Sequence, residues 1–193
     1  MLNINYTIVE HFKLNLTLAE KTLFPTNSAA VTGLADTDFK FKWRFVDERP
    51  EHWWPAMSMA PNVTFPTADK SRGLGDGLWR FRIPFQCGKT FGKLYTYVEA
   101  GYQIVFDQQT SDLFLYGYAL QYQQTDKLMI GAEVAGNVPY DDSANYTMLA
   151  NIGASYAFNK HWQLQASLGR TLREESRGGP KLLTQVFVQW NFW

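Results

Sequence analysis

The chain has 193 residues, and its 18 lysines and arginines balance 18 aspartates and glutamates, so the formal net charge is zero. This balance argues against nucleic-acid binding, which usually needs a basic excess. A single cysteine, Cys87, excludes an internal disulfide and a cysteine-based metal cluster. Aromatic residues are 16% and charged residues 19% of the chain, which fits a surface at a membrane interface or a large apolar core.

Apolar and polar side chains alternate along most of the chain, which is the period of a strand with two unlike faces. In the first half, this alternation predicts strands at residues 2–8, 14–18, 38–45 and 79–86. Residues 56–64 give a weaker signal, because Pro61 disfavours a regular ladder. Helical periodicity is nearly missing, and no apolar run is long enough for a transmembrane helix.

The second half alternates more regularly still. It predicts strands at residues 94–106, 114–122, 128–135, 146–158, 162–168 and 182–192, with Phe187 breaking the alternation of the last one. The total is about eleven strands, most of them about eight to twelve residues long. A tilted membrane-spanning strand needs roughly nine to eleven residues.

The connections between these strands alternate in length. Short ones fall at residues 9–13, 87–93, 123–127 and 159–161, and long ones at 24–36, 65–77, 138–145 and 173–180. The connection at 47–55 is long for a turn, and 107–112 is intermediate. Bacterial outer-membrane barrels have short periplasmic turns and longer extracellular loops. We therefore predict an all-β, transmembrane antiparallel β-barrel in the bacterial outer membrane, with residues 1–193 as one domain.

The direction of the strands also predicts what precedes Met1. If the C-terminus lies in the periplasm, the strand at residues 2–8 runs from outside to inside. Single-chain bacterial barrels have an even number of strands with both ends inside. We therefore expect an export signal and one further strand upstream, which would bring the complete barrel to about twelve strands.

Three features favour a membrane barrel over the alternative, a soluble two-sheet sandwich. First, charged residues stand at mid-strand on the polar face, where the lumen of a membrane barrel would hold them. Second, a barrel of about eleven strands closed around apolar side chains would leave a wide void inside. Third, aromatic residues cluster near the strand ends, as they do at a membrane interface. The last residues, Trp190-Asn191-Phe192-Trp193, are similar to the aromatic end that such barrels present to their assembly machinery, with Trp193 one residue beyond the apolar face. We expect outer-membrane lipid and this machinery, through the C-terminal strand, as partners.

Three segments resemble the outer-membrane family labelled "MetA-pathway of phenol degradation", a set of proposed transporters. They are Gly33-Leu34-Ala35-Asp36 with the basic strand after it, Pro61 to Asp69 with its Pro-Thr-Ala-Asp ending, and Gly73-Leu74-Gly75-Asp76-Gly77-Leu78-Trp79. Ala68 stands where the family has glycine. The glycines suit a chain that turns back on itself, and the loop either has this structural role alone or gates a substrate.

The charges of the polar face are the candidate site. They are Lys40, Lys42, Arg44, Arg80, Arg82, Glu99 and Glu133. They either form a salt-bridge ladder that fills a narrow barrel or a charged constriction that selects permeants. Five cations against two acids make this part of the wall positive, which predicts a mild anion preference if the pore is open. The function expected is a channel or transporter for passive passage of a small-molecule permeant, and the family resemblance implies an aromatic or hydrophobic one.

Two other functions stay open. One is a structural or surface-interaction barrel whose lumen is plugged by its own side chains, and the other is a lipid enzyme active at the rim. None of His11, His52 and His161 stands in a His-x-Ser-Asn pattern, so a histidine within reach of a serine nucleophile is not indicated. Asp141 and Asp142 are more typical of a solvated turn than of a calcium site. We therefore expect no enzymatic activity, no metal and no cofactor.

Overall fold

The computed structural model describes residues 2–23, 29–49, 51–173 and 182–190. Within them, no helix is long and apolar enough to cross a membrane. The elements in chain order are β1 (Leu2–Val9), β2 (Phe12–Leu18), β3 (Glu20–Leu23), β4 (Val31–Leu34), β5 (Thr37–Val46), β6 (Ala56–Met59), β7 (Asn62–Phe65), η1 (Lys70–Arg72), β8 (Arg80–Phe91), β9 (Leu94–Val105), β10 (Leu113–Gln123), β11 (Leu128–Pro139), η2 (Ser143–Asn145), β12 (Thr147–Ala157), β13 (Trp162–Arg173) and β14 (Leu183–Trp190).

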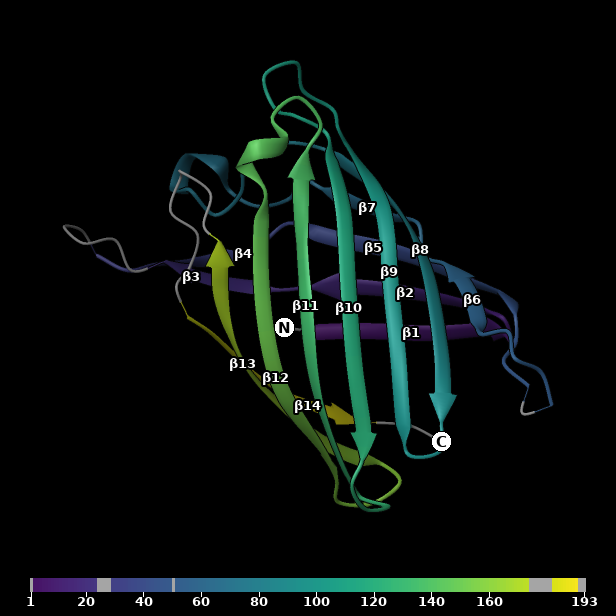
Figure 1. Cartoon of the computed structure of the whole chain (residues 1–193). Coiled ribbons are helices and arrows are strands. Elements are labelled where there is room, and N and C mark those ends of the chain that lie inside the picture. Colours follow the sequence, from purple (N-terminus) through teal and green to yellow (C-terminus); the bar gives the residue numbers. More distant parts are fainter. Residues whose placement is uncertain (1, 24–28, 50, 174–181, 191–193) are drawn as a thin grey trace.

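One antiparallel sheet contains 12 of these strands, in the order β1-β2-β5-β6-β8-β9-β10-β11-β12-β13-β14, with β7 also pairing with β5 and β8. Figure 1 shows the sheet curling on itself, so that β1, β2 and β5 lie behind β8 to β13. Over the described ranges, no ladder joins β1 to β14, which are the two ends of the pairing path. The predicted antiparallel all-β fold is confirmed, and the expected upstream strand stays a prediction.

The apolar face of the sheet is exposed and the polar face is buried, which is the opposite of a soluble protein. Large apolar side chains are exposed, with Ile152 at 64% and Phe114 at 49%, whereas polar Gln103 and Gln86 are only 4% and 8% exposed. Soluble domains bury the apolar set instead. We call the apolar side the outer face and the polar side the inner face. This distribution fits lipid outside and disfavours the soluble sandwich.

Aromatic side chains gather where β12, β13 and β14 meet the short-turn end. Trp162 stacks on Trp190 with ring centroids 5.8 Å apart, and Tyr156 meets Phe158 edge-on at 5.2 Å. All four side chains are exposed. This is the girdle expected where a barrel crosses the membrane interface. The predicted aromatic terminus beyond Trp190 lies outside the described residues.

The wall is irregular at one corner, where two prolines and a glycine lie on neighbouring strands. The strand predicted at 56–64 is split at Ala60 and Pro61 into β6 and β7, because Pro61 cannot donate to a ladder. Pro84, buried in β8, pairs with Gly101 of β9, and the backbone of Ala60 donates to the carbonyl of Pro84 over 3.2 Å. A Cβ on Gly101 would lie 2.8 Å from the Pro84 Cα, so the two backbones approach too closely for a side chain.

Two long connections pack together at the other end of the sheet. The β3–β4 hairpin, not predicted from the sequence, leads to Asp36, whose Oδ1 accepts the backbone N–H of Ala68 over 3.0 Å. Lys21 donates to the carbonyl of Leu74 over 3.2 Å, and Leu74 is 3% exposed. The segments that carry the family resemblance therefore contact one another, and their residues have a structural role in this loop pair.

The short helix η1 fixes the second of these loops. Asp69 is its N-cap and accepts hydrogen bonds from the hydroxyl and backbone N–H of Ser71 and from the N–H of Arg72. These hydrogen bonds, the Ser71 hydroxyl first, hold the pKa of the Asp69 carboxyl below its ordinary value. Gly73 ends the turn at φ 73°, a conformation that suits glycine.

We predict that Gly101→Ala destabilises the barrel by roughly 1–3 kcal/mol, because the added methyl group would meet the backbone of Pro84. Gly117→Ala on the adjacent strand is the matched control, since its Cβ would make ordinary contacts of 3.7 and 3.8 Å. Urea unfolding in detergent, followed by tryptophan fluorescence, measures both. Equal stability of the two variants would contradict the close approach at Pro84.

The loop pair predicts that Asp36→Ala loosens residues 66–79, because the Ala68 N–H loses its acceptor at a cost of roughly 1–3 kcal/mol. Limited trypsin digestion should then cut faster after Lys70 and Arg72. Asp107→Ala, which removes an exposed carboxylate bonded to Thr110, is the control and should leave this cleavage unchanged. Unaltered cleavage in Asp36→Ala would show that the loop does not depend on this hydrogen bond.

Candidate functional site

The strand register places all the predicted site residues on the inner face. Lys40 pairs with Asn62, Asn62 with Arg82, and Arg82 with Gln103, which makes one polar row across β5, β7, β8 and β9. The other members follow from the same two-residue period: Lys42, Arg44, Arg80, Glu99 and Glu133. The register therefore places these residues on one face of the sheet, whereas their part in permeation stays a prediction.

The arginines near the strand ends are paired with acids of the connections. Arg44 forms an ion pair of 2.8 Å with Asp47, and the His11 ring contacts the other oxygen of Asp47 at 2.5 Å. At the opposite end, Arg80 pairs with Asp76. The hydrogen bond from His11 and the charge of Arg44 hold the pKa of the Asp47 carboxyl below its ordinary value. These two arginines are locally neutralised.

The two mid-strand acids are satisfied by neutral donors. Glu99 accepts the side-chain amide of Gln86 over 2.7 Å and the hydroxyl of Tyr97 over 2.9 Å. Glu133 accepts the amide of Asn151 over 2.5 Å. Throughout the described ranges, no ion pair joins either acid to a lysine or arginine. The salt-bridge ladder considered from the sequence is therefore wrong for these two acids, because the register places an amide, Gln86 or Asn151, opposite each of them.

The predicted site cations that form no ion pair within the described residues are Lys40, Lys42 and Arg82. The guanidinium of Arg82 donates to the Gln103 side-chain oxygen over 2.8 and 3.2 Å, which orients it without cancelling its charge. Lys40 and Lys42 have neither an ion pair nor a hydrogen bond within the described part of the chain. A positive region thus remains on the walls formed by β5 and β8.

A hollow of about 270 Å³ opens on the inner face at the short-turn end. Its charged and aromatic lining is Glu10, His11, Lys13, Lys42, Arg44, Tyr95 and Tyr97. Here the β1–β2 turn, β2 and β5 face the corner formed by β6, β8 and β9. The hollow therefore contains more cations than acids, next to two tyrosines.

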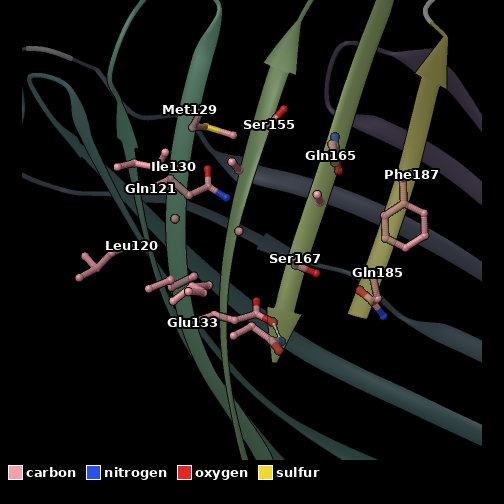
Figure 2. Close-up of a pocket in the computed structure, with 18 residues that line it drawn as sticks. Leu120, Gln121, Met129, Ile130, Glu133, Ser155, Gln165, Ser167, Gln185 and Phe187 are labelled. Atoms are coloured by element: carbon pink, nitrogen blue, oxygen red, sulfur yellow. Dashed lines mark hydrogen bonds between the residues drawn. The ribbon is translucent and has the colours of Figure 1, made fainter. Parts of the chain in front are cut away.

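A second hollow, of about 340 Å³, lies along β10 to β14. Figure 2 shows its inner lining of amides, hydroxyls and one acid: Gln121, Glu133, Ser155, Gln165, Ser167 and Gln185. Phe187, the residue that breaks the alternation of the last strand, points inward among them, whereas Leu120 points away to the outer face. The side of the interior formed by β10 to β14, which we call the open side, is thus polar and nearly uncharged.

Some residues of these hollows were not found from the sequence. Lys13 was assigned to a turn at 9–13, but it is the second residue of β2 and faces inward. The alternation of Lys13, Asn15 and Thr17 was the available signal. The inner position of Tyr95 and Tyr97 follows from the period of β9, but no sequence feature shows that they lie across from Lys42.

Two of the three histidines contact other side chains of the described residues. His52 stacks on Trp54 at 3.8 Å, and His11 is engaged with Asp47. Over the same residues, no group of three His, Cys, Asp or Glu side chains could hold a metal ion. The absence of enzymatic activity stays a prediction, because no observation tests it.

Comparison with known proteins agrees with this architecture. The crystal structure of the COG4313 outer membrane channel from Pseudomonas putida F1 is similar, with a TM-score of 0.69 and 16% identity, over 97% of this chain and 79% of that one. At this identity, the likeness shows a shared fold. No curated protein matches the sequence. The family described as "Putative MetA-pathway of phenol degradation" matches residues 5–187, and the chain belongs to this family.

Proposed function

We propose that the protein is an outer-membrane channel that lets a small solute cross passively. The observation that carries the proposal is the inner face. There Lys13 and Lys42, which form no ion pair with any described residue, line a hollow of about 270 Å³, and a second, polar hollow of about 340 Å³ lies along β10 to β14. Charged side chains without partners are costly inside a packed core but are stable in a water-filled lumen. The fold that this chain shares with an outer membrane channel, and the exposed apolar outer face, support the same location and activity.

The charge distribution supports a preference for anions. Among the described residues, Lys40, Lys42 and Arg82 form no ion pair on their side of the interior, whereas Glu99 and Glu133 are separated and bonded to amides. Rings of charged side chains select ions by sign in other pores. An anionic permeant would therefore meet a favourable wall. An aromatic or hydrophobic permeant, as the family description suggests, remains part of this proposal.

A plugged structural barrel is the second candidate, because one corner of the interior is filled. Ser58, Asn62, Gln86 and Gln103 are each at most 9% exposed, and Ser58 donates to Gln86 over 3.2 Å. This packing covers the corner of β6, β7, β8 and β9 but leaves the wall of β10 to β14 open. The channel is therefore the function that the geometry supports better.

Planar-bilayer recording of the refolded protein tests the proposal. We expect discrete conductance steps and a reversal potential, under a salt gradient, that indicates anion preference. The double variant Lys40→Glu with Arg82→Glu should abolish or reverse this preference, because it changes the sign of the inner wall. Lys127→Glu, in the exposed turn between β10 and β11, should leave it unchanged.

A silent bilayer, with the barrel shown to be folded, would contradict the channel and favour the plugged barrel. Cation preference of the unsubstituted protein would contradict the assignment of the positive wall. An unchanged reversal potential in the double variant would show that these residues do not line the permeation path.

A further inference from the structure

Two lysines stand directly opposite each other on the inner face. The register of β2 and β5 pairs Lys13 with Lys42, and Lys40 and Arg44 flank Lys42 on the same face of β5. Like charges in direct opposition destabilise a sheet. In the described ranges, neither Lys13 nor Lys42 has an ion pair or a hydrogen bond that would offset this repulsion. Lys40 and Arg44 add to the repulsion on Lys42, and the charge of Glu99 acts against it without an ion pair.

The same two lysines line the 270 Å³ hollow at the short-turn end. Of its other charged residues, Arg44 is neutralised by Asp47, and Glu10 forms no ion pair with either lysine. Two ammonium groups therefore face one space with a single acid near its rim. This is the arrangement that a bound anion would stabilise, since it would accept charge-assisted hydrogen bonds from both.

Tyr95 and Tyr97 form an aromatic side of this hollow, and both rings are held in place. The hydroxyl of Tyr97 donates to Glu99 over 2.9 Å. Tyr95 lies over Gly88, where a Cβ would approach its ring carbon Cζ to 2.7 Å. Fixed aromatic rings favour a second ring packed against them in an offset or edge-on arrangement.

We propose that Lys13 and Lys42, with Tyr95 and Tyr97, form a binding site for a small carboxylate that carries an aromatic ring. The carboxylate lies between the two ammonium groups and removes their repulsion, and the ring packs against the tyrosines. The inference rests on the proposed channel function and specifies its solute class. Occupancy of this hollow would concentrate the solute at the short-turn mouth of the pore.

Isothermal titration calorimetry of the refolded barrel in detergent tests the site without any need for conductance. Benzoate is the probe, cyclohexanecarboxylate tests the ring, benzyl alcohol tests the charge, and acetate tests the anion alone. We expect saturable benzoate binding, binding of cyclohexanecarboxylate and acetate at least several-fold weaker, and none of benzyl alcohol. Lys13→Gln or Lys42→Gln should weaken benzoate binding about tenfold or more, as expected for loss of a charge-assisted hydrogen bond, and Lys127→Gln should not change it.

Stability provides a second readout that a purely structural lysine would not give. Without ligand and at low salt, Lys42→Gln should raise the urea midpoint of unfolding, because it removes the repulsion with Lys13. Benzoate should raise the midpoint of the unsubstituted protein and raise that of Lys42→Gln clearly less at the same concentration. A lysine needed only for folding would lower the midpoint when replaced.

The outcomes separate this site from the channel. Conductance without saturable benzoate binding would overturn the site alone, and binding without conductance would support the site while contradicting the channel. Equal benzoate affinity in Lys13→Gln, Lys42→Gln and Lys127→Gln would overturn the assignment of these lysines. Acetate binding as tight as that of benzoate would overturn the aromatic ligand class.

Discussion

The antiparallel ladder is the constraint on which the rest of the structure depends. Inside a membrane, each backbone N–H and C=O must find its partner within the protein, and the antiparallel ladder achieves this wherever two strands are paired. The ladder also sets a period of two, so each strand turns one set of side chains to lipid and the other inward. A shift of one residue would exchange the faces. The continuous registers of β9 to β12 keep Glu99 and Glu133 inside and Val98 and Val134 outside.

The interior that follows from this period is uneven. At the corner of β6 to β9, prolines and Gly101 bring the backbones close, and small polar side chains fill the space between them. Along β10 to β14, small residues such as Ala119, Gly131 and Gly153 alternate with larger polar ones on the inner face, and a hollow remains. The inner cations Lys13, Lys40 and Lys42 stand on β2 and β5, which lie behind the strands of this side in Figure 1. A filled corner, a positive wall and a polar open wall together give the interior its electrostatic asymmetry, which is the basis of the proposed selectivity.

Most of the strands could be predicted from the sequence, because alternation reports directly which residues share a face. The same signal placed Lys40, Lys42, Arg44, Arg82 and Glu133 inside. What it could not give was the partner of each charge. The acids that pair with Arg44 and Arg80 come from connections, and amides from adjacent strands occupy Glu99 and Glu133. Such contacts depend on register and loop conformation, which alternation does not encode.

The loops show the same limit. Residues 24–36 were predicted as a polar connection, yet β4 lies within them and pairs with β3, and both pack near residues 66–79. Short strands of four residues carry too little pattern to be recognised. The glycines of the family segments were noticed, but their reason became clear only from the structure: Gly33 lies against Leu74, and Gly75 against Asp36 and Ala68.

The most direct test of the central claim compares two neighbouring positions on β13. Ser167 lines the inner hollow, and Leu168 is on the outer face with 47% of its surface exposed. In a Cys87→Ala background, Ser167→Cys and Leu168→Cys are reconstituted in lipid vesicles and treated with a charged, water-soluble thiol reagent. The account predicts that the cysteine at 167 is labelled and the one at 168 is protected by lipid. Labelling at 168 with protection at 167 would contradict it, because the polar face would then not be the inner one.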